Sequence, residues 1–164
     1  MPIYMKCEEV KGEVTAEGYK DTVEVLSFQY GAGMPVTAPS TSNTGKRTEG
    51  HVSLSEITIS KMVDNASGVI FDKLAAGTSV PKIEFFFSKA TGSDASGNDN
   101  YLVVTIEDVF FSGQSFSSGG GLPSESVSLN YAKIKTNYMK DSVKGDLTQG
   151  SLSGWDLTTN KHYA

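Results

Sequence analysis

The stretch SGGGLPSESVSLNYAKI, residues 118–134, joins a glycine run to an alternation of polar and apolar side chains. Val127, Leu129 and Tyr131 fall on one face of an extended chain, while two serines and an asparagine fall on the other. This period of two is typical of a strand with one buried face. We therefore predict a strand here, with Leu129 and Tyr131 in the core, and we find no catalytic group in it.

The same alternation recurs toward the N-terminus, in TVEVLSFQYG at residues 22–31. Leu26, Phe28 and Tyr30 share one face, which we assign to the core, and Ser27 and Gln29 share the polar face. Similar patterns predict further strands at residues 3–7, 51–61, 81–90 and 100–116, with a bulge near residues 55–56 and a hairpin formed by the last two.

One segment, DNASGVIFDKLAAG at residues 64–77, has the signals of a helix. Ile70 and Leu74 are four residues apart, and Gly77 supplies a left-handed stop. Three polar residues at the start can cap it, namely Asp64, Asn65 and Ser67. About seven strands and one short helix predict a single mainly β domain over residues 1–164, built as a small antiparallel β-barrel with two packed sheets.

The composition excludes several classes of protein. The 164 residues have a formal net charge of −5, so no basic surface is available for nucleic acid, and no segment is apolar for long enough to insert in a membrane. The single cysteine excludes a disulfide framework. The start, MPIYMKCEEVKGE, lacks the features of a classical signal peptide, and we expect synthesis in a reducing cytoplasm.

Residues able to perform chemistry do not form a catalytic pattern. His51 and His162 have no metal-ligating neighbours at motif spacing, and Cys7 shares its parity with core residues. The acidic pairs at residues 8–9 and 107–108 are each adjacent in sequence, and adjacent side chains on a strand point to opposite faces, so neither pair can easily flank one glycosidic bond. Residues 94–100 lack the glycine and glutamate of a calcium loop, and GKRT at 45–48 lacks the rest of a phosphate loop. We expect no catalytic residues, cofactor or metal.

Six segments carry a resemblance to a known family. They are VKGE (10–13), EVLSFQYGAG (24–33), ISKMVDNASG (59–68), YLVVTIEDVFFSG (101–113), LPSESVSLNYAKIK (122–135) and GWDL (154–157). In this order they resemble haemolysin-coregulated (Hcp) proteins, the tube proteins of the bacterial type VI secretion system. The resemblance implies a small β-barrel with one helix, a fold shared with phage tail tubes.

The resemblance also implies a function. Relatives form homohexameric rings that stack into a hollow tube, which is assembled in the bacterial cytoplasm and secreted by a contractile sheath with a spike at its tip. Small effector proteins bind in the lumen. By this match Ser27 and Gln29 face the lumen and its cargo. The polar segment between Gly33 and Gly50 corresponds to the loop that contacts neighbouring subunits or rings, with Met34, Pro35, Thr37, Ser40, Asn43, Lys46 and Arg47 as its contact residues.

Two alternatives stay open at this point. The chain fits a monomeric β-domain that binds a sugar or another protein through its loops, with Tyr4, Tyr101 and Trp155 as candidate contacts. It also fits a phage tail-tube protein, a close structural relative.

Overall fold

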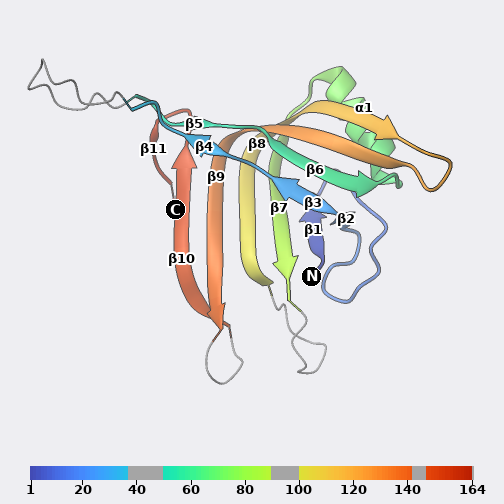
Figure 1. Ribbon diagram of the computed structural model, residues 1–164, viewed down its shortest axis with the longest axis horizontal. Coiled ribbons are helices and arrows are strands. Elements are labelled where there is room, and N and C mark those ends of the chain that lie inside the picture. The colour runs from blue at the N-terminus through green and yellow to red at the C-terminus, as the bar shows by residue number, and fades with distance from the viewer. Residues whose placement is uncertain (37–49, 90–99, 142–146, 164) are drawn as a thin grey trace, which may run out of the picture.

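The computed structural model describes residues 1–36, 50–89, 100–141 and 147–163. The strands and the helix are drawn in Figure 1. They are β1 (Ile3–Lys6), β2 (Val23–Val25), β3 (Ser27–Gln29), β4 (Ala32–Gly33), β5 (Ser53–Leu54), β6 (Ile57–Met62), α1 (Ala66–Ala76), β7 (Val80–Ser88), β8 (Asn100–Ser117), β9 (Ser124–Asp141), β10 (Leu147–Asp156) and β11 (Lys161–His162). The mainly β fold with one short helix is the predicted class.

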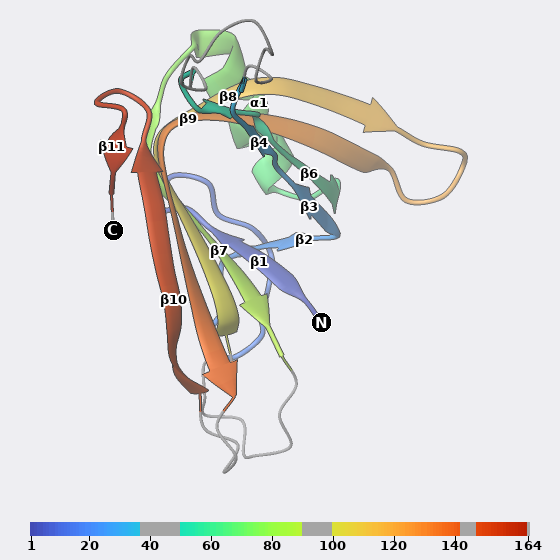
Figure 2. The ribbon, with the colours of Figure 1, turned by 60° about the vertical axis from the view of Figure 1, so that its left-hand side comes forward.

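Most strands belong to one bent sheet in which long strands serve two layers. Its order is β11-β10-β9-β8-β7-β1-β2, and β6 and β3 branch from β9. The first half of β9 pairs with β6, and its second half pairs with β10. Figure 2 shows the two arms diverging from the bend in β8 and β9. A separate ribbon pairs β4 with β5.

The predicted β-barrel with two packed sheets differs from the structure in one respect, because its sheet is not closed. Among the described residues the hydrogen-bonded order ends at β2 in one layer and at β3 in the other. β2 and β3 are consecutive strands that are not paired with each other. β2 pairs with β1, and at Leu26 the chain changes partner, because the Leu26 N–H donates to the carbonyl of Ser60 on β6. The sheet therefore folds over on itself without closing.

The break at Leu26 also corrects two predicted core residues. Val23 and Val25 are buried on β2, but the chain changes partner at Leu26, and Leu26 and Tyr30 are 56% and 40% exposed. Phe28 packs on the core, with its ring centroid 4.9 Å from that of Phe85. The other two predicted core residues, Leu129 and Tyr131, are buried.

The predicted bulge near residues 55–56 is a change of strand. β5 pairs with β4, whereas β6 pairs with β3 and β9, so the alternation shifts phase between the two. Ser55 ties this break to Gly31: its N–H donates to the Gly31 carbonyl, and its Oγ accepts from the Gly31 N–H. The strand predicted over residues 51–61 is therefore two strands.

The helix α1 follows its predicted signals at the C-terminal end. Gly77 has φ of 64°, the left-handed conformation that ends a helix, and its N–H donates to the Leu74 carbonyl. At the start, Asp64 Oδ1 accepts the Ala66 N–H at 2.9 Å. Ile70 is buried against the sheet.

Strands β7 and β8 pair from Val80 with Val109 to Ser88 with Asn100, which confirms the predicted hairpin. Its tip, residues 90–99, lies outside the described residues. In the part of the chain that the structure describes, no helix has the length and apolarity needed to cross a membrane.

Candidate assembly and lumen surface

One of the two layers consists of four strands in the order β3-β6-β9-β8, and these strands present one uncharged polar face. Ser27 lies opposite Ser60, which lies opposite Ser126 on β9. Directly paired side chains in a sheet point to the same face. We call this set the hydroxyl face: Ser27, Gln29, Thr58, Ser60, Gly113, Ser115, Ser126 and Ser128.

The hydroxyl face contains the two residues predicted to line the lumen. Ser27 and Gln29 are both exposed, and the Ser27 and Ser60 Oγ atoms are 2.6 Å apart, within hydrogen-bonding distance. The opposite face of the same strands is apolar, with Ile59 and Leu129 fully buried. The sequence alternation therefore produces a wall with a neutral polar side and an apolar back.

This four-stranded wall has an unpaired edge at each end. Within the described residues, β3 pairs with β6 alone, and residues 113–117 of β8 pair with β9 alone, because β7 stops pairing at Val109. Figure 2 shows this half of β8 and β9 projecting away from the rest of the molecule. Unpaired strand edges are templates for pairing with another chain.

Exposed apolar side chains accompany both edges. Leu26 precedes β3, and Phe116, on β8, is 57% exposed. Phe116 alternates with Ser115 and Ser117, so it points to the back of the wall. An edge that has both unpaired backbone N–H and C=O groups and exposed apolar side chains is suited to contact with another subunit.

A buried ionic cluster fastens α1 to the back of the wall. Lys61 Nζ, fully buried on β6, lies 2.6 Å from Glu125 Oε1 on β9 and 2.7 Å from Asp64 Oδ1. The Ser67 hydroxyl donates to the same Glu125 oxygen, and Gln114 Nε2 donates to its second oxygen, each at 2.6 Å. We call Lys61, Asp64, Ser67, Gln114 and Glu125 the buried ionic cluster.

The cluster fixes the charge state of Glu125. Burial acts to raise the pKa of this carboxyl, but hydrogen bonds from Lys61, Ser67 and Gln114 outweigh burial and leave the pKa below its ordinary value. Glu125 is therefore ionised at neutral pH. The hydrogen bonds and the close ion pair offset the cost of burying both charges, since a buried charge without a counter-ion would strongly destabilise the fold.

Sequence reasoning missed this cluster, although a signal was present. Lys61 has the parity of the buried Ile57 and Ile59 on β6, and Glu125 has the parity of Val127 and Leu129 on β9. A lysine and a glutamate at core positions of two strands that pair with each other indicate an internal ion pair.

The loop residues predicted to contact other subunits are described only in part. Met34 and Pro35 are exposed, and the Pro35 carbonyl accepts the Gly50 N–H at 3.1 Å. The remaining predicted contacts, Thr37, Ser40, Asn43, Lys46 and Arg47, lie outside the described residues.

The residues considered for chemistry contact different partners. His51 is exposed, with Nδ1 2.9 Å from the Asn160 side-chain nitrogen, and His162 is exposed on β11. Burial raises the pKa of the Cys7 thiol. Glu107 accepts the Tyr163 hydroxyl at 2.7 Å. Within the described residues, no group of metal-ligating side chains is gathered in one place.

The three aromatic residues considered for sugar or protein binding do not form one site. Tyr4 stacks on Tyr19 with ring centroids 4.3 Å apart. Tyr4, Tyr101 and Trp155 line three different pockets. A single aromatic platform is therefore not formed by these residues.

Comparison with known proteins identifies relatives with this architecture. A family model described as "Type VI secretion system effector, Hcp" matches residues 4–138. Among solved structures, one described as a type six secretion system protein is 26% identical, with a TM-score of 0.87 and 99% of each chain covered. Hcp1 from Salmonella typhimurium is 24% identical, with a TM-score of 0.77 and coverage of 99% of this chain and 98% of that one.

Hcp2 from Salmonella typhimurium, at 22% identity, has a TM-score of 0.70, with 98% of this chain and 99% of that one covered. No curated protein matched the sequence. The family match spans most of the chain, from residue 4 to residue 138. The chain belongs to the Hcp family, the secreted structural tube proteins of the type VI secretion system.

Proposed function

We propose that this protein forms homohexameric rings by pairing the free edge of β3 in one subunit with the free half of β8 in the next. The two unpaired edges of one four-stranded wall carry this proposal. Strand direction alternates across β3-β6-β9-β8, because each of the three pairings is antiparallel. A neighbour's β3 placed beside β8 would continue the same alternation, so copies can join head to tail without a break in the sheet.

Joining the walls in this way would place every hydroxyl face on the same side. The faces would line the central lumen, and the apolar back of each wall would stay covered by its own subunit. The exposed Leu26 and Phe116 would be buried where two walls meet. Their exposure in the single subunit is then explained by the missing neighbour.

The ring proposal is tested by placing a charge at one edge. Phe116→Asp puts a carboxylate where the neighbour would pack, and Phe71→Asp, on α1 at 55% exposure against 57%, is a matched control. Mass by light scattering and negative-stain electron microscopy should show rings for the wild type and for Phe71→Asp, and mainly monomers for Phe116→Asp. Rings of unchanged abundance in Phe116→Asp would refute edge pairing.

We also propose that the lumen carries small effector proteins, in contact with Ser27 and Gln29. A neutral wall of hydroxyl and amide groups offers hydrogen bonds to many surfaces without a strong charge preference. Gln29→Arg should reduce co-purification of effectors, while Asp72→Arg on the exposed side of α1 should leave it unchanged. Full retention of every effector by Gln29→Arg would contradict the cargo role.

The rest of the proposal follows the family. The rings stack into a tube, which is assembled in the cytoplasm and expelled with the sheath and spike proteins. The segment between Gly33 and Gly50, including Lys46 and Arg47, makes contacts between subunits or rings. Secretion of a tagged copy, abolished by loss of the sheath, would support this route.

A further inference from the structure

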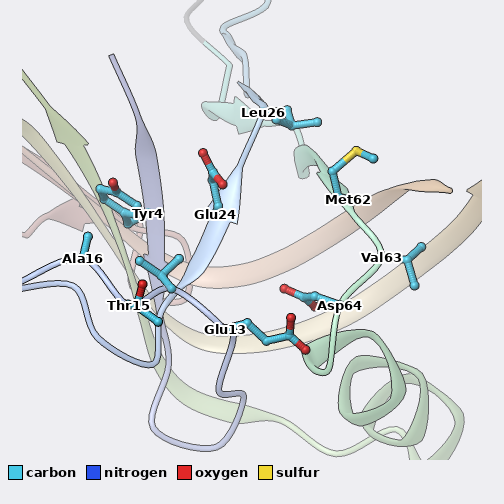
Figure 3. A pocket seen from close by; sticks show the side chains of 10 residues that line it. Tyr4, Glu13, Thr15, Ala16, Glu24, Leu26, Met62, Val63 and Asp64 are labelled. Carbon is cyan, nitrogen blue, oxygen red and sulfur yellow. The ribbon is translucent and has the colours of Figure 1, made fainter. Parts of the chain in front are cut away.

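The gap left by the unclosed sheet contains a pocket. The pocket has a volume of about 430 Å³ and lies between β2 and the end of β6, which belong to different layers of the fold. Figure 3 shows Glu24, on β2, and Met62, on β6, on opposite sides of it. We call this site the gap pocket, and its lining includes Glu13, Glu24, Leu26, Met62, Val63 and Asp64. A single subunit thus leaves an opening at the start of β3.

The lining of the gap pocket combines apolar and acidic groups. Its apolar side chains are substantially exposed, with Leu26 at 56%, Met62 at 36% and Val63 at 37%. Glu24 makes no hydrogen bond or ion pair with another described residue, and Glu13 accepts only the Asn65 N–H among the described contacts. Carboxylates are strong acceptors for backbone N–H groups. A fitting occupant therefore brings an apolar side chain together with hydrogen-bond donors.

The turn between β8 and β9 has these properties. It comprises residues 118–123, SGGGLP, which we call the hairpin tip. Leu122 is 83% exposed. Within the described part of the chain, none of the N–H groups of residues 119–122 donates a backbone hydrogen bond. The hairpin tip thus presents an apolar side chain beside unused donors.

Two glycines of the hairpin tip are not required by the subunit itself. Gly120 has φ of 101°, so the turn needs glycine at this one position of the run. At Gly119 and Gly121, which lack a positive φ, an added Cβ would meet no atom within 4 Å. Glycine is also used where another chain approaches the backbone closely. The run of three glycines therefore indicates contact with a chain outside the subunit.

The strand registers place the hairpin tip beside the gap pocket of a neighbouring subunit. The rows of the wall, read toward β8, are Ser27–Ser60–Ser126–Ser115 and, two residues further along, Met62–Ser124–Ser117. In the proposed ring, a neighbour's β3 that continues the rows places the partner subunit's Ser27 beside Ser115. The hairpin tip follows Ser117, so it lies past the start of the partner's β3, where the partner's gap pocket opens.

The hairpin tip of the same subunit is held away from its own gap pocket. The Val63 N–H donates to the Pro123 carbonyl, so the tip adjoins the edge of β6 that faces β9. The gap pocket adjoins the opposite edge of β6, which faces β3 and Leu26. None of residues 118–123 is among the described residues that line the pocket. The occupant is therefore a second copy of the chain.

We propose that the gap pocket receives the hairpin tip of the adjacent subunit in the ring, with Leu122 against Leu26 and Met62 and the glycine N–H groups on Glu24. This inference rests on the proposed ring and adds a contact outside the paired strands. Each subunit supplies a tip to one neighbour and a pocket to the other, so the contact repeats head to tail around the ring. The opening in each fold is filled only on assembly.

Disulfide trapping tests this contact. The double variant Leu122→Cys with Glu24→Cys is assembled, mildly oxidised and run on a denaturing, non-reducing gel. One cysteine faces each neighbour, so trapping should give a ladder from covalent dimers to hexamers. The matched control is Leu122→Cys with Asp72→Cys, at an exposed carboxylate on α1, and wild-type protein gives the background from the buried Cys7. A disulfide needs Cα atoms within about 7 Å, so we expect covalent hexamers to be about five-fold more abundant than in the control.

The sign of a charge at the hairpin tip supplies a second test. Leu122→Asp would bring a fourth carboxylate to the gap pocket, whereas Leu122→Lys would bring a cation on an apolar stem. Because like charges opposed across an interface are costly, Leu122→Asp should dissociate into subunits at about ten-fold higher concentration than Leu122→Lys, measured by light scattering. Phe71→Asp and Phe71→Lys, at a 55% exposed position on α1, should not differ. Urea unfolding should be equal for the two Leu122 variants, since this side chain is exposed in the subunit.

The outcomes separate this inference from the ring. Rings that give no more covalent hexamer than the Asp72 control, or that dissociate equally with Asp and Lys at position 122, would overturn the tip contact and leave edge pairing intact. An intrachain disulfide between positions 122 and 24, without a ladder, would overturn the contact between copies. Absence of rings in the wild type would refute the ring and the tip contact with it.

Discussion

Replacing Lys61 with methionine would leave the carboxylate of Glu125 buried without its counter-ion. Both side chains of this pair are fully buried, with 2.6 Å between Lys61 Nζ and Glu125 Oε1. Removing one partner of a buried pair typically costs about 3–5 kcal/mol. Whole domains are stable by only about 5–15 kcal/mol. We therefore expect Lys61→Met to lower the melting temperature by about 6–20 °C, from roughly 2–4 °C for each kcal/mol in a chain of this size.

A variant that removes both charges distinguishes the free-energy cost of one unpaired buried charge from the net contribution of the ion pair to stability. Lys61→Met with Glu125→Leu removes both charges, and such replacements are often close to neutral. Gln114 Nε2 would lose its carboxylate acceptor but keep the Ser67 carbonyl at 3.1 Å. We expect a residual loss of about 1–2 kcal/mol for a weakened buried hydrogen-bond network.

Urea unfolding followed by circular dichroism measures these free energies. A matched control is Lys82→Met, because the Lys82–Glu84 pair is 3.1 Å long and its side chains are 53% and 24% exposed. An exposed pair contributes about 0–1 kcal/mol. The reasoning is refuted if Lys61→Met costs no more than Lys82→Met, or if the double variant is as unstable as the sum of the two single variants.

Three further predictions follow from groups near the same core. The pKa of Glu125 in the folded protein is below its ordinary value of 4.5. The ionised carboxylate therefore stabilises the fold above pH 4.5, and this stabilisation is lost as the pH falls through the folded pKa. The free energy of unfolding, measured as a function of pH in acid, should show this loss in the wild type and a smaller loss in the double variant. Burial raises the pKa of Tyr131 to about 12, so ultraviolet titration should show a tyrosine that ionises near this pH in the wild type and is missing in Tyr131→Phe. The same substitution removes the hydrogen bond to the Ser55 carbonyl and should cost about 1 kcal/mol in urea unfolding. Gly77→Ala should cost about 1 kcal/mol in the same assay because alanine is strained at φ of 64°, and an unchanged stability would contradict the left-handed cap.

Local patterns were sufficient to predict much of the fold. The alternation around Leu129 predicted β9, and Gly77 predicted the end of α1, because side-chain direction and backbone conformation are properties of a few neighbouring residues. Partner changes depend on distant parts of the chain. Leu26 and residues 55–56 mark points where a strand leaves one neighbour for another, so a continuous alternation predicted single strands where the structure has two.

The candidate wall shows the same division between local and distant information. The polar parity of Ser27 and Gln29 was readable, but their alignment with Thr58, Ser60 and the serines of β9 depends on registers between strands more than 25 residues apart. The free edges could not be predicted, since an edge is defined by which strand fails to acquire a neighbour. One pocket likewise gathers Glu13, Glu24 and Asp64 from three separate segments.

The buried ionic cluster gives the neutral face its register. Ser60 and Lys61 are adjacent on β6, as are Glu125 and Ser126 on β9, and the pairings align Ser60 with Ser126 and Lys61 with Glu125. A slip of β6 by one residue would turn Lys61 toward the hydroxyl face and leave Glu125 without its counter-ion. The unpaired buried carboxylate alone would add about 3–5 kcal/mol to the cost of this slip, besides the loss of burial of Ile57 and Ile59. Charges buried behind the wall thus select the alignment that keeps its exposed face uncharged.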